Sequence, residues 1–265
     1  MTRIEGQVVL ITGASSGIGK ALAEDLRSVG AKVYGTSRKA ADSEPGMLQL
    51  DVRSEESVVK AVKRVMDKEG RIDVLINNAG YCLAGAVEDV SHAEAYEQLD
   101  TNFFGVLRMF RAVLPIMRAQ RSGLVLNISS VAGRVTLPYQ SMYSASKYAL
   151  EAVTEALRLE AKAFGIRVSM IEPGDTKTKC TANRLTAAAT AGSVYEKRTL
   201  KAVETMARSE QGAAEPRAIL RIARRILASK NPPVRVAVGF EYKLVVLMFR
   251  LLPAKLVGFV LDKIY

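Results

Sequence analysis

Short apolar runs alternate with longer amphipathic segments over the first 175 residues of the chain. The runs VVLIT, DVLIN and LVLNI are apolar over nearly their whole length, as parallel strands buried on both faces are. Such runs predict strands at residues 8–12, 31–36, 47–52, 74–76, 123–129 and 166–171. Helical spacing predicts helices at residues 20–29, 55–68, 91–107 and 143–164, and Ser91 with Glu94 forms a capping-box signature for the third of them. This alternation implies a parallel sheet with helices on both faces.

The C-terminal third of the chain has a different pattern. Residues 176–215 are rich in Ala, Thr and charged residues, which indicates a mobile insertion long enough to close over a ligand as a substrate lid. Residues 234–238 predict a seventh strand, and residues 240–265 predict a helical tail. A chain of 265 residues suits one large α/β domain. We therefore expect a single domain over residues 1–265, built on a doubly wound parallel sheet of about seven strands.

Positive charge is concentrated near the C-terminus. The formal net charge is +11, and residues 184–265 carry +9 of it. Such a region can meet a membrane surface, an acidic substrate or nucleic acid. We expect a solvated helical face and no nucleic-acid partner, because basic and aromatic residues are not interleaved and no nucleic-acid-binding motif is recognised. The apolar tail with its scattered cations leaves peripheral contact with a membrane open.

Cysteine and histidine usage argues against metal or disulfide chemistry. Cys82 and Cys180 lie far apart and His92 is the single histidine, so we expect neither a metal site nor a disulfide framework. The chain opens without the charged and apolar regions of a signal peptide. Its longest apolar stretch, residues 244–264, is interrupted by charged residues and a proline, so no transmembrane segment is expected. These features favour a cytoplasmic location.

A glycine-rich segment, TGASSGIG at residues 12–19, follows the first predicted strand and opens the first helix. Glycines let the backbone approach a pyrophosphate closely, and a helix N-terminus presents free N–H groups to it. The Gly-x3-Gly-x-Gly spacing differs from the commoner Gly-x-Gly-x-x-Gly fingerprint. Its place between a strand and a helix nevertheless predicts a dinucleotide cradle. The residues that would form it are Gly13, Ser15, Ser16, Gly17, Ile18 and Gly19.

The end of the second strand distinguishes NAD from NADP. An acidic residue there would bind the ribose 2′-hydroxyl of NAD. The chain instead has Ser37 and Arg38, which can hydrogen-bond and pair with the 2′-phosphate of NADP. NADP(H) is therefore favoured over NAD(H), with a plain surface arginine as the alternative. Ligands bind at the carboxyl ends of parallel strands, which predicts further cofactor contacts. These are Asp51, Val52, Asn78, Ala79 and Gly80.

Tyr143 and Lys147 lie four residues apart in a predicted helix and therefore share a face. A phenol has a pKa of about 10, and a nearby ammonium lowers it, which makes Tyr143 a candidate general acid/base. Lys147 can also hold the nicotinamide ribose, so both residues are expected to contact the cofactor. Ser130 ends an apolar strand, where it can polarise a carbonyl or cap a helix. Asn102 lies in an otherwise apolar helical stretch. It can hold a water that passes protons to Lys147, or it can be a satisfied core amide.

These motifs occur in a familiar order: TGASSGIG at 12–19, NNAG at 77–80, Asn102, Ser130, YSASK at 143–147 and PG at 173–174. In these motifs and their order, the chain resembles the classical short-chain dehydrogenase/reductase family over residues 8–178. The resemblance implies a Rossmann-type fold and pro-S hydride transfer by a tetrad of Asn102, Ser130, Tyr143 and Lys147. It also implies a nicotinamide beneath the Pro-Gly turn, although the chain departs from the family's Pro-Gly-x-(Val/Ile)-x-Thr pattern at positions 175 and 176. The contacts expected there are Pro173, Gly174, Thr176 and Thr178.

The same resemblance suggests a substrate class and an assembly. The tail resembles the C-terminal extension of reductases that act on hydroxysteroids, retinoids and other hydrophobic alcohols, which implies a small lipophilic substrate. The family also implies a homodimer or homotetramer that pairs the helices near 93–118 and 144–164. One alternative is a 3-oxoacyl-[acyl-carrier-protein] reductase, which shares the N-terminal pattern but usually ends soon after the last strand. Another is a non-catalytic NADP-sensing regulator, against which the intact tetrad argues.

Overall fold

The computed structural model describes residues 3–40, 45–176, 184–213 and 216–264. Its main sheet has seven strands, and every neighbouring pair is parallel. The strands, in order across the sheet, are β3 (Met47–Gln49), β2 (Lys32–Ser37), β1 (Val8–Ile11), β4 (Val74–Asn77), β6 (Gly123–Ile128), β7 (Ile166–Glu172) and β9 (Arg235–Ala237). This arrangement confirms the predicted doubly wound sheet. The third strand is shorter than the predicted 47–52, because its partner β2 ends at Ser37, which pairs with Gln49.

Alternate residues of β1 enter two different hydrophobic cores. Val8 and Leu10 belong to the cluster on one face of the sheet, and Val9 and Ile11 belong to the cluster on the other. Successive side chains of a strand point to opposite faces, so a strand between two cores must be apolar at every position. This geometry explains why the run VVLIT shows no polar alternation.

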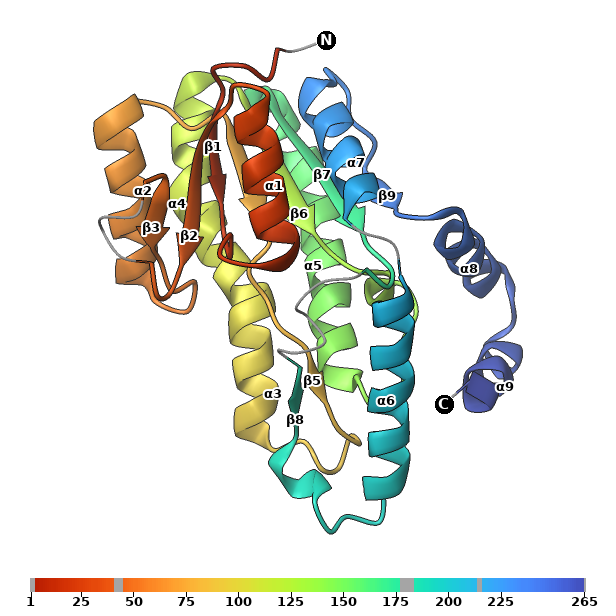
Figure 1. Cartoon of the computed structure of the whole chain (residues 1–265). Helices are drawn as coiled ribbons and strands as arrows, with labels where there is room; N and C mark the ends of the chain where they lie inside the picture. The colour runs from red at the N-terminus through yellow and green to blue at the C-terminus, as the bar shows by residue number, and fades with distance from the viewer. Residues whose placement is uncertain (1–2, 41–44, 177–183, 214–215, 265) are drawn as a thin grey trace.

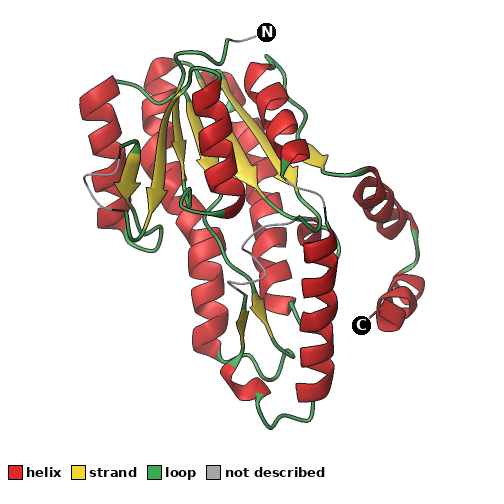
Figure 2. Cartoon of the chain, in the orientation of Figure 1, coloured by secondary structure: helices red, strands yellow, loops and turns green. Residues whose placement is uncertain are grey.

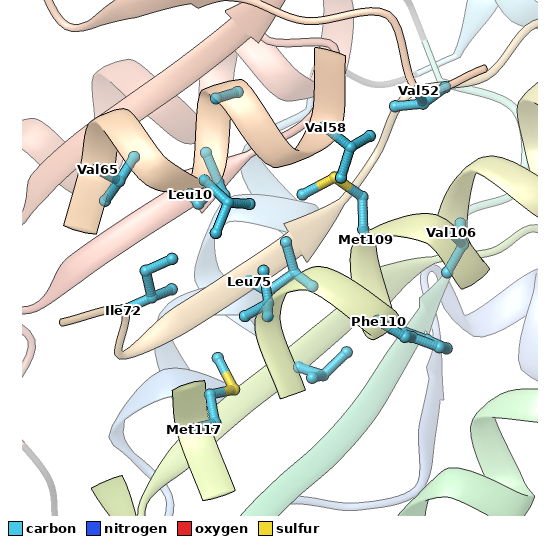
Figure 3. Packing of buried hydrophobic residues seen from close by; sticks show 14 of the residues in the cluster. Leu10, Val52, Val58, Val65, Ile72, Leu75, Val106, Met109, Phe110 and Met117 are labelled. Carbon is cyan, nitrogen blue, oxygen red and sulfur yellow. The ribbon is translucent and has the colours of Figure 1, made fainter. Parts of the chain in front are cut away.

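Helices cover both faces of the sheet (Figure 2). Helices α1 (Gly17–Ser28) and α7 (Arg217–Ala228) supply apolar side chains to one core. Helices α2 (Glu55–Glu69), α4 (Gly105–Gln120) and α5 (Ser141–Glu160) supply the other. Figure 3 shows this second cluster, in which side chains of α2 and α4 meet Leu10 and Leu75 of the sheet. The two layers of helices fix the carboxyl ends of the strands, where a ligand is expected.

The predicted helix over residues 91–107 begins where expected, but it contains a π-helical turn and continues beyond Leu107. Helix α3 (His92–Leu99) begins with the expected capping box of Ser91 and Glu94. A π-helical turn, Asp100–Phe104, follows it, and α4 then continues to Gln120. Asn102 lies within this turn and is buried. A π-helical turn accommodates an extra residue in the helix, and such turns are frequent at functional sites.

The insertion after β7 contains more regular structure than its composition indicates. It forms β8 (Leu185–Thr186), a short 3-10 turn at Ala188–Thr190, and the long helix α6 (Glu196–Gly212). Strand β8 pairs with β5 (Leu83–Ala84) in a small second sheet. Figure 1 shows α6, β5 and β8 beyond the carboxyl ends of the main strands. The tail is helical as expected, and consists of α8 (Phe240–Leu251) and α9 (Ala254–Ile264).

Candidate active site

The glycine-rich turn joins β1 to α1 and has the shape of a phosphate cradle. Gly13 and Gly17 adopt positive φ angles of 68° and 55°, a region that side chains with a Cβ rarely enter. A Cβ on Gly19 would collide with the carbonyl oxygen of Gly13 and with the Asn78 amide. Helix α1 begins at Gly17 with no acidic residue in its first turn, and its N-cap residue Ser16 makes no capping bond within the described chain. Its first N–H groups and positive dipole end therefore suit the pyrophosphate of a dinucleotide.

The end of β4 is tied to this cradle by hydrogen bonds. The Asn78 amide donates to the carbonyl oxygens of Thr12 (3.0 Å) and Gly13 (2.9 Å). The buried Thr12 hydroxyl accepts from the backbone N–H groups of Asn78 and Ala79, both at 3.0 Å. Gly80 lies against Asn102, whose Oδ1 would be 3.0 Å from an added Cβ. The structure thus brings the predicted residues 78–80 together with the cradle, and adds Thr12 as the residue that positions them.

Ser37 and Arg38 follow the cradle at the carboxyl end of β2. The Ser37 hydroxyl accepts from the backbone N–H of Lys39 at 3.2 Å, which leaves its own O–H available as a donor. Nearby, the Asp51 carboxylate accepts two hydrogen bonds from the Arg53 guanidinium, and these bonds lower the pKa of Asp51. Val52 is buried and faces Gly105. Its side chain therefore belongs to the core, so any contact of Val52 with an adenine would come from its backbone.

Tyr143 and Lys147 lie in the first two turns of α5, next to the carboxyl end of β6. The Lys147 ammonium is 5.8 Å from the centre of the Tyr143 ring. It donates a hydrogen bond to the carbonyl oxygen of Ile128 at 2.9 Å, which fixes the buried lysine side chain at the strand end. The i, i+4 spacing thus produces the shared face that the sequence predicts.

Ser130 follows β6 and faces the Pro-Gly turn. Its hydroxyl accepts from the backbone N–H of Ala132 at 3.1 Å and so caps the short 3-10 turn Val131–Gly133. The same oxygen lies 3.4 Å from the carbonyl oxygen of Pro173, to which it donates. The helix-cap interpretation is therefore correct for one of its bonds. The second bond is long, and its donor is free to turn toward a carbonyl placed nearby.

Asn102 connects the loop after β4 to α5. Its Oδ1 accepts from the backbone N–H of Tyr81 at 3.1 Å, and its Nδ2 donates to the Tyr81 carbonyl oxygen at 3.0 Å. Nδ2 also donates to the Ser146 hydroxyl at 3.1 Å. Asn102 thus has the bonding of the satisfied core amide that we considered as its alternative role. Its bond to Ser146 places it next to Lys147 on α5, because Ser146 directly precedes that lysine.

The Pro-Gly turn after β7 meets both the insertion and the tail. The aromatic ring of Tyr242, from α8, lies directly on Gly174, where any side chain would collide with it. Burial and the adjacent Asp175 carboxylate raise the pKa of Tyr242 to about 12. Asp175 also accepts a hydrogen bond from Ser209 of α6. The Thr176 hydroxyl donates to the Gly174 carbonyl at 3.2 Å, and Thr178 lies outside the described residues.

Two buried glutamates lie behind this centre. Glu151 follows Lys147 by one helical turn, and Glu172 directly precedes Pro173. Arg235 lies 3.7 Å from the Glu151 carboxylate and 3.6 Å from that of Glu172. Burial is the largest influence on both carboxyl groups: it raises the pKa of Glu151 to about 8 and raises that of Glu172. The i+4 spacing from Lys147 could have identified Glu151 as a residue on the same helix face. That Glu172 lies next to Glu151 depends on the fold, because the two residues come from α5 and β7.

Comparison with known proteins identifies a family and several relatives of this chain. Residues 7–189 match the family described as short chain dehydrogenase. The chain is 44% identical over 239 residues to a 3-ketodihydrosphingosine reductase from Bacteroides thetaiotaomicron, an alignment that covers 89% of each protein. Among solved structures, a short-chain dehydrogenase from Streptomyces avermitilis is 33% identical, with a TM-score of 0.79 and coverage of 93% of this chain and 92% of that one.

Relatives of known structure hold either cofactor. A short chain dehydrogenase from Burkholderia cenocepacia in complex with NADP is 27% identical, with a TM-score of 0.68 and coverage of 94% and 95% of the two chains. A short chain dehydrogenase/reductase from Burkholderia phymatum in complex with NAD is 23% identical, with a TM-score of 0.83 and 94% coverage of each chain, and this likeness shows the fold alone. Within the described residues, no group of three or more His, Cys, Asp and Glu side chains could hold a metal ion.

Proposed function

The chain belongs to the short-chain dehydrogenase family and is an oxidoreductase, and we propose that it uses NADP(H) to interconvert a secondary alcohol and a ketone, or an aldehyde, on a lipophilic substrate. One observation carries this assignment. Tyr143 and Lys147 share a face of α5 beside Ser130 at the carboxyl end of β6, where parallel sheets bind their ligands.

The roles of these residues follow from their chemistry. A bound nicotinamide supplies or accepts the hydride. In the direction of reduction, Tyr143 donates a proton to the substrate oxygen, and in oxidation it takes that proton back. The Ser130 hydroxyl donates to the same oxygen and stabilises the negative charge that develops there. The Lys147 ammonium favours the phenolate form of Tyr143, and its bond to Ile128 keeps it in place.

The residues present fit a dinucleotide phosphate. The cradle Gly13–Gly19 would hold the pyrophosphate, with help from Asn78 and Thr12. Arg38 and Ser37 would hold the 2′-phosphate of NADP, because β2 ends without the acid that a free 2′-hydroxyl prefers. The Pro-Gly turn would contact the nicotinamide. Asn102 would act by positioning the loop at Tyr81 against α5.

Two observations support a lipophilic substrate. The relative from B. thetaiotaomicron carries a name that records reduction of a keto group on a sphingoid base. In this chain, α6 lies beyond the carboxyl ends of the strands and is tied to the Pro-Gly turn through Ser209 and Asp175, as a lid over the site would be. We therefore place in this site the ketone or aldehyde group of a lipophilic molecule, such as a sphingoid base, a steroid or a retinoid.

A panel of carbonyl compounds tests the assignment. NADPH oxidation is measured with 3-ketodihydrosphingosine, a ketosteroid, retinal and an acetoacetyl thioester of acyl carrier protein. We expect turnover of one or more of the first three at a rate well above that of the thioester. Turnover of the thioester alone would make the chain a 3-oxoacyl-[acyl-carrier-protein] reductase. Tight NADPH binding without turnover of any ketone would favour a cofactor-sensing regulator.

The assembly is a further part of the proposal. Several large apolar side chains on the π-helical turn and α5 are exposed in the single chain, among them Phe104, Tyr148 and Leu159. Helices of this region are the ones expected to pair in a homodimer or homotetramer. Sedimentation velocity should give two or four times the monomer mass, and a monomer at micromolar concentration would contradict this part.

A further inference from the structure

Helix α8 carries apolar residues on two opposite sides, yet none of its residues is buried. Nine of its twelve residues, FEYKLVVLMFRL, are apolar. A helix with this composition is normally enclosed in a protein core or in contact with a membrane. Figure 1 shows α8 and α9 set apart from the helices that cover the sheet. An exposed apolar surface of this kind marks a site of contact with a protein partner or a membrane.

The apolar residues of α8 form two stripes on opposite sides of the helix. One stripe, which includes Tyr242, Val246 and Phe249, is partly buried. The other is exposed, and Phe240 and Leu251 at its two ends have 80% and 73% of their surface accessible. Both stripes follow the i, i+3, i+4 spacing of a single helix face. The exposed stripe consists of Phe240, Leu244, Leu247, Met248 and Leu251.

Cations line one edge of the exposed stripe. Lys243 and Arg250 lie about two helical turns apart on the same side of α8. Both line a groove of about 660 Å³ between α8, α5 and β9. Among the described residues, neither of them forms an ion pair. Three further cations line the same groove, against two acids. They are Arg134, Arg158 and Arg235.

We propose that α8 and α9 form a docking surface that binds an anionic phospholipid membrane. The exposed stripe would enter the boundary between headgroups and acyl chains, and Lys243 and Arg250 would meet lipid phosphates. Leu256 and Phe259 extend the exposed apolar surface onto α9. No helix of the described residues is long and apolar enough to cross a membrane, so α8 would lie along the surface.

Charge favours a membrane over a second copy of the chain as the occupant. A two-fold dimer through this face would place the same patch on both sides of the interface. The exposed cations Lys243 and Arg250, which border the stripe, would then be brought together with those of the second copy, and the like charges would repel. An anionic bilayer instead offers negative charge to the cations and an apolar interior to the stripe.

The docking surface adjoins the proposed site. Tyr242, on the partly buried stripe of α8, lies on Gly174 of the Pro-Gly turn. This contact fixes the orientation of α8 relative to the body, so that its other stripe faces outward. A lipophilic substrate dissolved in the bilayer would thus reach the protein at the side on which the site lies.

Vesicle binding by the full-length protein tests this surface. Binding is measured by flotation with phosphatidylcholine vesicles that do or do not contain about one-third phosphatidylglycerol, at about 50 mM salt and again at about 500 mM. We expect binding to the anionic vesicles at low salt, with the partition coefficient of Phe240→Ser/Leu251→Ser at least roughly tenfold lower. Lys243→Gln/Arg250→Gln should lose about fivefold per charge at low salt and much less at high salt.

Matched variants separate docking from general effects. Val194→Ser removes an apolar side chain that is 88% exposed, and Lys60→Gln/Lys197→Gln removes two exposed cations elsewhere. Both controls should bind vesicles like the wild type, and all variants should retain NADPH binding as a sign of correct folding. Wild-type protein that fails to float with anionic vesicles, or tail variants that float equally well, would overturn the proposal. So would a change of oligomeric state in Phe240→Ser/Leu251→Ser without a loss of vesicle binding.

Discussion

Single residues in this chain often serve the fold and the proposed chemistry together. Ser130 caps a 3-10 turn with its oxygen and keeps a weaker bond from its hydroxyl proton to Pro173. The Asn102 amide group donates to Tyr81 and to Ser146. Asn102 therefore holds the loop after β4 against α5. The sequence motifs identify such residues, because their spacing is local. Their hydrogen-bond partners cannot be predicted in the same way, since they come from segments distant in the sequence.

The proposed preference for NADP(H) rests mainly on Arg38 and on the missing acid at the end of β2. Replacement of Arg38 by Glu would remove the cation for a 2′-phosphate and introduce the acid that binds a 2′-hydroxyl. We expect the Kd for NADPH to rise by roughly tenfold to a hundredfold, as for a lost charged hydrogen bond, while the Kd for NADH stays within about threefold or improves. Cofactor titration of Arg38→Glu and of the control Lys60→Glu measures both values. Equal losses for the two cofactors would remove Arg38 from this role.

At the scale of elements, periodicity predicts most of the sheet and its helices. The seven main strands and the capping box of α3 follow from patterns within short windows. The β5–β8 pair is different, because each strand has two residues and its pairing joins segments about a hundred residues apart. The π-helical turn interrupts a helix whose apolar spacing shows no break. The contact of Tyr242 with Gly174 likewise depends on the path of the tail.

A single added methyl group tests whether the junction of β1 and α1 is the cofactor cradle. A Cβ at position 19 would meet the Gly13 carbonyl and the Asn78 amide, so Gly19→Ala must displace the cradle or its support. We expect NADPH binding to weaken at least tenfold, with a Tm lower by a few degrees. Gly212→Ala is the matched control, because nothing lies within 4 Å of a Cβ there. Unchanged NADPH binding in Gly19→Ala would be inconsistent with this cradle.

For the whole molecule, the buried pair of Glu151 and Glu172 makes stability depend on pH. The pKa of Glu151 is raised by burial to about 8 in the folded chain, and the unfolded chain has the ordinary value near 4.5. The folded state therefore binds this proton more tightly. Its stabilising contribution is complete below pH 4.5 and is lost as the pH rises through 8.

Comparison with an uncharged isostere isolates this contribution. Glu151→Gln stays neutral, so its free energy of unfolding should gain on that of the wild type by up to about 1.4 kcal/mol per pH unit between pH 5 and 8. Urea unfolding at several pH values measures the difference, and Glu56→Gln, at an exposed position of α2, is the control. Parallel pH curves for the wild type and Glu151→Gln would show that the carboxyl titrates normally.

We propose above that this molecule transfers hydride with Tyr143 as its general acid/base. The most direct test compares the wild type with Tyr143→Phe, which removes one oxygen and keeps the ring beside Lys147. With the best ketone from the panel, kcat should fall by roughly a hundredfold to ten-thousandfold, because proton transfer contributes about that much. The Kd for NADPH should stay within about twofold, because the cradle is untouched. A Tyr143→Phe enzyme that keeps a large part of the wild-type kcat would show that Tyr143 is not the general acid/base.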